Sequence, residues 1–180
     1  MIYLIGGMPR VGKSTLAQMI LERNKISWMP LDTVREALHA VSPTLGIQEG
    51  DDWWVGHHEK FFPFLRELVD SIQIARMSYT LEGDSFTPTH AEELSKKFQV
   101  KACFLGASKL DVEILTTHKG AGDPWLDTVS EEKLNSLPGW IMKKSEEYKS
   151  ECEKYGVKYF DVSLDHKKTL EDAYEYLMKE

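Results

Sequence analysis

Cysteine is scarce in this 180-residue chain, which contains only Cys103 and Cys152 and has neither a CxxC pair nor a metal-type cluster. No apolar run approaches the roughly 20 residues of a membrane-spanning helix. The segment 1–5, which precedes the first glycine, is too short for a secretory signal. We therefore expect a cytoplasmic protein with reduced structural thiols and no membrane association.

Positive charge is also in short supply, because 22 lysines and arginines face 29 aspartates and glutamates and the net charge is −7. Proteins that bind duplex or non-specific nucleic acid usually carry an extended basic surface. The charge balance argues against a nucleic-acid partner, whereas a small anionic ligand needs only local positive charge.

The apolar content of 42% is sufficient for a packed core, and no linker or repeat divides residues 1–180 into more than one domain. Short apolar runs are typical of strands buried on both faces, and amphipathic helical stripes separate them. These runs cover residues 2–5, 26–31, 78–81, 100–105 and 157–162. The alternation predicts an α/β fold with a mostly parallel sheet, helices on both faces, and ligands bound beyond the carboxyl ends of the strands.

A glycine-rich loop follows the first run and opens the first helix. Its residues fit G-x-x-x-x-G-K-[S/T] and are Gly7, Met8, Pro9, Arg10, Val11, Gly12, Lys13 and Ser14, followed by Thr15. The glycines let several amide N–H groups point at one phosphate, and the helix N-terminus adds its dipole. Lys13 can reach the β- and γ-phosphates, and the Ser14 hydroxyl is suited to ligating Mg²⁺. The loop, including Thr15, predicts a nucleotide site.

Asp32 ends the second apolar run, and Arg35 follows in the first turn of the next predicted helix. A carboxylate at this point can orient or deprotonate an acceptor hydroxyl, and a guanidinium can grip an anionic group bidentately. Alternatively, Asp32 only caps the helix and Arg35 pairs on the surface.

Glu82 and Asp84 flank Gly83 just beyond the third run. P-loop enzymes place at this position the acid that holds Mg²⁺ through water, a role that we assign to Glu82. Asp84 is a candidate for substrate contact. Alternatively, Glu82 and Asp84 only form a solvated acidic turn.

Trp53, Trp54, His57 and His58 form a cluster near the start of a long amphipathic segment. The two tryptophans can stack on a substrate ring, or one can be core and the other partly exposed. Adjacent histidines on a helix diverge, so a hydrogen-bonding or surface role is expected rather than metal ligation.

With these motifs the chain resembles the nucleoside and nucleotide kinase group of P-loop proteins, relatives of adenylate, shikimate and polynucleotide kinases. The resemblance implies a three-layer sandwich around a five-stranded parallel sheet in the order 2-3-1-4-5. It also implies an acceptor-binding region at about residues 33–77 and a mobile lid at about 106–130. In this group an Asp-x-x-Arg after the second strand often belongs to the acceptor site, as Asp32 and Arg35 would here.

One feature departs from the group, whose lids commonly supply arginines to the transferring phosphate. This sequence has no arginine after Arg76, so Lys109, His118 and Lys119 are the cations available in the expected lid. Lysine lacks the planar fork of arginine. Arg10 in the glycine loop can contribute by touching phosphate, or it can face solvent.

The leading hypothesis is Mg²⁺-dependent phosphoryl transfer from ATP to a small-molecule acceptor, with Lys13, Asp32 and Arg35 as the catalytic set. A nucleotide-sensing module without turnover and a polynucleotide 5′-kinase are the alternatives. GTP is not supported, because the sequence has no Asn-Lys-x-Asp segment to read guanine. The sequence leaves the acceptor and the oligomeric state undetermined.

Overall fold

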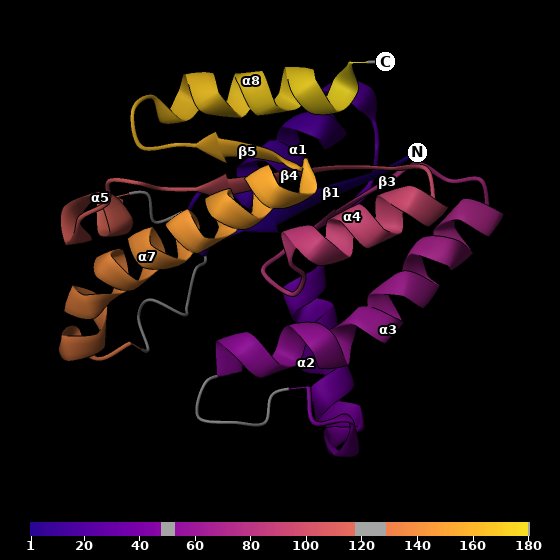
Figure 1. Cartoon of the computed structure of the whole chain (residues 1–180), viewed down its shortest axis with the longest axis horizontal. Coiled ribbons are helices and arrows are strands. Elements are labelled where there is room, and N and C mark those ends of the chain that lie inside the picture. The colour runs from indigo at the N-terminus through magenta and orange to yellow at the C-terminus, as the bar shows by residue number, and fades with distance from the viewer. Residues whose placement is uncertain (48–52, 118–128, 180) are drawn as a thin grey trace.

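The computed structural model describes residues 1–47, 53–117 and 129–179, with only the backbone described for 53–57. Its centre is a five-stranded, all-parallel sheet in the order β2-β3-β1-β4-β5 (Figure 1). The strands are β1 Ile2–Gly7, β2 Trp28–Pro30, β3 Tyr79–Glu82, β4 Val100–Gly106 and β5 Lys158–Asp161. This confirms the expected fold class and strand order.

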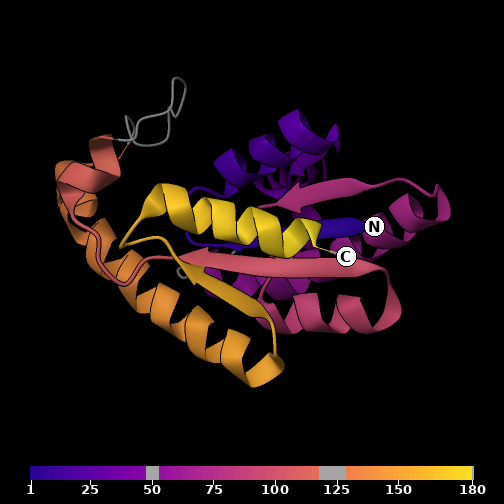
Figure 2. The same cartoon turned by 90° about the horizontal axis from the view of Figure 1, so that it is seen from above.

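Helices cover both faces of the sheet. Along the chain they are α1 Lys13–Asn24, α2 Leu31–Val41, the short 3₁₀ turn η1 Pro43–Leu45, α3 Trp53–Ile74, α4 Pro88–Lys97, α5 Val112–Thr117, α7 Glu131–Tyr155 and α8 His166–Met178. In Figure 1, α1 and α8 lie above the strands, and α3, α4 and α7 lie below them. Seen from above, α8 runs across β4 and β5, which it contacts (Figure 2). The result is three layers, with the glycine loop at one end of the central strand.

The second strand is shorter than expected and ends one residue earlier. Pro30 has no backbone N–H to extend the strand ladder, and its fixed φ suits the residue that precedes a helix. Leu31 therefore starts α2, and Asp32 lies in the first helical turn instead of at the end of a strand. Asp32 still lies beyond the edge of the sheet, as expected, but it belongs to a helix and not to a strand.

Two helices have local features that the sequence explains. Thr87 is the N-cap of α4, and its Oγ1 accepts from the His90 N–H at 3.3 Å. The proline after Thr87 favours the first helical position, which is consistent with a cap at Thr87. Pro63 lies inside α3.

The core is continuous and joins the two sides of the sheet. Phe104 of β4 is fully buried, and its ring meets Phe86 and Tyr148 edge-on at 5.4 and 5.5 Å between centroids. Cys103 and Cys152 are both buried and free, as expected. Among the described residues, no helix has the length and apolar character required to cross a bilayer.

Candidate functional site

The glycine loop connects β1 to α1 at the carboxyl end of the central strand. Gly7 has a φ of 128° and lies so close to β4 that an added Cβ would stand 2.0 Å from the Leu105 carbonyl oxygen. Gly12 has a φ of 96° and is the last residue before the helix. Only glycine tolerates these conformations without strain, so the sequence pattern and the backbone agree.

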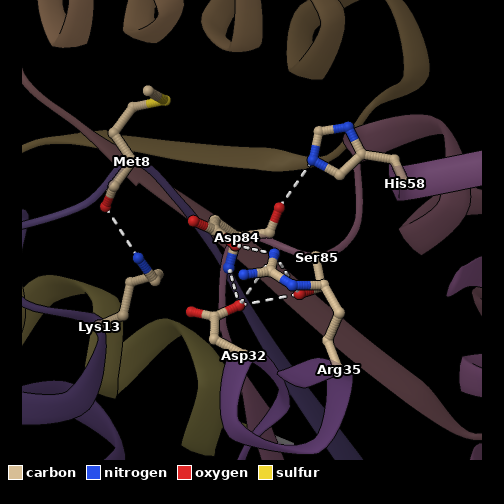
Figure 3. Close-up of polar contacts among 7 residues, drawn as sticks. All are labelled: Met8, Lys13, Asp32, Arg35, His58, Asp84 and Ser85. Carbon is tan, nitrogen blue, oxygen red and sulfur yellow. Dashed lines mark hydrogen bonds and ion pairs between the residues drawn. The ribbon is translucent and has the colours of Figure 1, made fainter. Parts of the chain in front are cut away.

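Lys13 opens α1, and its side chain turns back over the loop. Its Nζ donates a hydrogen bond of 2.8 Å to the Met8 carbonyl, and the residue is only 8% exposed (Figure 3). The ammonium is therefore held above the loop backbone, where a phosphate cradled by the loop amides would meet it.

Ser14 and Glu82 face each other across the end of the sheet. Ser14 Oγ donates to Glu82 Oε1 at 3.1 Å. Glu82 is buried, and burial raises the pKa of its carboxyl, an effect that the Lys13 charge partly offsets. A hydroxyl and a carboxylate oxygen at this spacing are the hard ligands that Mg²⁺ accepts directly or through water.

The described parts of the chain contain no group of three or more His, Cys, Asp or Glu side chains that could hold a metal alone. Mg²⁺ in proteins is usually bound by one or two protein groups together with phosphate oxygens and water. Ser14 and Glu82 fit such a shared site, and a metal there would depend on a bound nucleotide.

Beside Lys13 lies a second polar cluster, which we call the acceptor-side cluster and define as Asp32, Arg35, Asp84 and Ser85. Arg35 Nη1 donates to Asp84 Oδ1 at 2.9 Å and to Ser85 Oγ at 3.2 Å. It lies 3.8 Å from Asp32 Oδ1. The same oxygen of Asp32 accepts from Ser85 Oγ at 2.8 Å and from the Asp84 N–H at 3.2 Å. Both carboxylates thus share one guanidinium (Figure 3).

The members of this cluster differ in their exposure. The side chains of Arg35 and Asp84 are 7% and 9% exposed, whereas that of Asp32 is 36% exposed. Burial and the nearby Asp84 charge raise the pKa of Asp32 to about 6, although Lys13 and Arg35 act in the opposite direction. Asp32 is therefore the charged group of this cluster that a ligand can reach.

Two further residues support the cluster. His58 of α3 is buried, and its Nε2 lies 2.7 Å from the Asp84 main-chain oxygen, in agreement with the hydrogen-bonding role expected for this histidine. Gly83 permits Asp32 to approach, because an added Cβ would stand 2.8 Å from Asp32 Oδ1. Ser85 was not predicted, and only its position next to Asp84 could have suggested it.

The remaining predicted residues are only partly accounted for. The Trp53 and Trp54 backbones begin α3, but their side chains and that of His57 lie outside the described residues, as do His118 and Lys119. Arg10 Nη2 donates to the Leu115 carbonyl of α5 at 3.1 Å, so the arginine of the glycine loop contacts the expected lid. Lys109 is also described, and its backbone N–H donates to Ser163 Oγ at 2.8 Å.

A scan against protein-family models and a search of curated proteins both gave no match. Solved structures do match over nearly the whole chain. A gluconokinase from Sinorhizobium meliloti has a TM-score of 0.55 and 14% identity, covering 97% of this chain and 90% of that one. A shikimate kinase from Bacteroides thetaiotaomicron has a TM-score of 0.55 and 15% identity, with coverages of 99% and 96%.

An uncharacterized protein from Eubacterium ventriosum is similar to the same degree, with a TM-score of 0.54, 15% identity, and coverages of 100% and 99%. At these identities the similarity extends to the fold alone. The strand order, the glycine loop between β1 and α1 and the neighbours together show that this chain has the fold of the P-loop kinases.

Proposed function

We propose that this protein catalyses Mg²⁺-dependent phosphoryl transfer from ATP to a small-molecule acceptor. The observation that carries the proposal is the adjacency of a phosphate loop and a largely buried, charged acceptor-side cluster at one end of the sheet. A module that only bound nucleotide would need the first of these but not the second.

On the donor side, the loop from Gly7 to Thr15 binds the triphosphate. Lys13 exchanges its contact with the Met8 carbonyl for the β- and γ-phosphates, where its charge gains value as negative charge develops. Ser14 and Glu82 would hold Mg²⁺, and a metal bound there would supply positive charge against the negative charge that develops on the phosphates. Most of the catalysis would then be positioning and electrostatics.

On the acceptor side, Asp32 orients the acceptor hydroxyl and takes its proton, and Arg35 and Asp84 keep Asp32 in place. Residues about 33–77, which include most of α2 and all of α3, are the acceptor-binding region in this proposal. Residues about 106–130, which include α5, are the lid. The contact between Arg10 and Leu115 supports coupling of that lid to the phosphate loop.

The test is to incubate the purified protein with Mg-ATP and a broad panel of nucleosides, nucleotides, sugars and small acids, and to follow ADP release and labelled product. Lys13→Ala should lower transfer by about 10²- to 10³-fold, the usual cost of one preorganised charge donor. Lys96→Ala, on an exposed lysine of α4, is the matched control and should leave transfer unchanged. The proposal fails if no panel member is phosphorylated and Lys13→Ala binds ATP as well as the wild type.

A nucleotide-sensing module without turnover is the second candidate, favoured by the lack of any arginine after Arg76. In that case Asp32→Asn would leave the functional readout unchanged, because sensing needs no proton acceptor. A polynucleotide 5′-kinase is opposed by the net charge of −7.

A further inference from the structure

Arg35 was expected to grip an anionic group of the acceptor, yet its surroundings differ from those of an open anion site. Its Nη1 already donates to Asp84 and Ser85, and the side chain is 7% exposed. An anion that displaced Asp84 would leave a carboxylate with 9% exposure without its cation, which is strongly unfavourable. Arg35 is better placed to organise the two carboxylates than to receive a third.

The net charge of the acceptor-side cluster also argues against an anionic acceptor. Asp32 and Asp84 contribute two negative charges, and Arg35 contributes one positive charge, so the ionised cluster carries an excess negative charge. Lys13, the other cation that acts on Asp32 among the described residues, belongs to the phosphate loop and is needed there. An anionic acceptor would meet net repulsion at this position.

The reachable atom of the cluster is a hydrogen-bond acceptor. Within the described chain, the hydrogen bonds to Asp32 all end on Oδ1. Figure 3 shows the other carboxylate oxygen on the side of Lys13, away from Arg35. A group that binds this oxygen must donate a hydrogen bond, as a hydroxyl does and an ionised carboxylate or phosphate does not.

We infer that the acceptor is an uncharged alcohol of the sugar or nucleoside type, with no carboxylate or phosphate at the end that meets Asp32, an inference that rests on the proposed phosphoryl transfer. In the transfer, the acceptor O–H bond breaks and its proton passes to Asp32. The oxygen forms a bond to the γ-phosphorus, and the bond from that phosphorus to the β–γ bridging oxygen breaks to release ADP.

The experiment uses matched pairs that differ in charge, namely glucose with gluconate, adenosine with AMP, and glycerol with glycerate. Acceptor-dependent ADP release is measured with Mg-ATP, together with ATP binding in the absence of acceptor. In any pair that reacts, the neutral member should have at least a tenfold higher kcat/KM. A preference for the anionic member overturns the inference while phosphoryl transfer stands. ATP binding without stimulation by any member contradicts the proposed function itself, and the inference with it.

A variant tests the physical reason. Asp84→Asn keeps the shape of the side chain but removes one carboxylate from Arg35, so the ratio of neutral to anionic kcat/KM should fall by tenfold or more. Asp172→Asn, the same change on an exposed residue of α8, should leave the ratio unchanged. If Asp84→Asn lowers both members of a pair equally, Asp84 is only structural and the charge argument is wrong. The ratio of neutral to anionic kcat/KM in the wild-type protein tests the inference even if this variant does not fold.

Discussion

The chemistry of Asp32 depends on its surroundings. The removal of its carboxyl from water and the nearby Asp84 charge raise its pKa to about 6, despite the opposing charges of Lys13 and Arg35. A general base works best when its pKa lies near the operating pH, because it is then ionised yet still basic. The environment of Asp32 therefore matches the role proposed for it.

The first prediction concerns the pH dependence of activity. Asp32 must be ionised to accept a proton, so kcat/KM should fall as the pH drops through about 6 in the free enzyme. Asp32→Asn should remove this acidic limb and lower kcat by about 10²- to 10⁴-fold. The measurement is a pH–rate profile for the best acceptor, with Asp172→Asn as the control. A wild-type limb near pH 4 would argue against Asp32 as the base.

The second prediction is that Asp32→Asn stabilises the protein without nucleotide or metal. Because the pKa of Asp32 is higher in the folded than in the unfolded chain, folding binds a proton between about pH 4 and pH 6. Stability contributed by this residue is present below that window and is lost as the pH rises through it. Because the Asp32 side chain is partly exposed, we expect Asp32→Asn to raise the free energy of unfolding by only about 1 kcal/mol.

At about pH 7.5 this gain should raise Tm by about 2–4 °C, and it should shrink below about pH 4, where both forms are uncharged. Thermal unfolding of wild type and Asp32→Asn at the two pH values, in EDTA, measures the difference. A variant that is less stable at both pH values would show that the hydrogen bonds of Asp32 outweigh its charge.

At the scale of elements, α4 depends on a local cap. Thr87 Oγ1 accepts from the His90 N–H, and His90 Nδ1 lies 3.4 Å from the Thr87 nitrogen. The side chain of each residue is therefore hydrogen-bonded to the backbone N–H of the other. Thr87→Ala should lower the free energy of unfolding by about 1 kcal/mol, whereas Thr87→Ser should retain most of it. Urea denaturation measures both.

Ser95→Ala is the matched control for the cap, because Ser95 lies on the same helix and donates to the Glu92 carbonyl at the surface. This change should have little effect on the free energy of unfolding. If Thr87→Ala cost no more than Ser95→Ala, the assignment of the cap would be wrong.

At the scale of the whole molecule, Phe104 joins the sheet to the helices on one of its faces. Its ring packs against Phe86 before α4 and Tyr148 of α7, and it passes so close to β1 that a Cβ on Gly6 would stand 2.3 Å from it. Phe104→Ala should lower the free energy of unfolding by about 3–5 kcal/mol in urea, and Phe104→Leu should cost less. A loss below 1 kcal/mol for Phe104→Ala would mean that the layers repack without it.

The order of the elements was predictable because each one leaves a local pattern. Continuous apolar runs marked the strands, and amphipathic stripes marked the helices. The sheet order came from the resemblance, and the structure confirms it. Boundaries were less accurate, as at β2, which Pro30 ends one residue earlier than expected.

By itself, the sequence determined the phosphate loop. That site is built from consecutive residues, so its glycines, Lys13 and Ser14 reach their places through local backbone geometry alone. The acceptor-side cluster was decided by tertiary structure. Asp84 follows Arg35 by 49 residues, and the two meet only because β2 and β3 pair in parallel and end at the same edge. We predicted that Arg35 would bind an anionic group of the acceptor, but in the structure Asp32 and Asp84 share its guanidinium. The physical reason is burial, since charges removed from water must be paired.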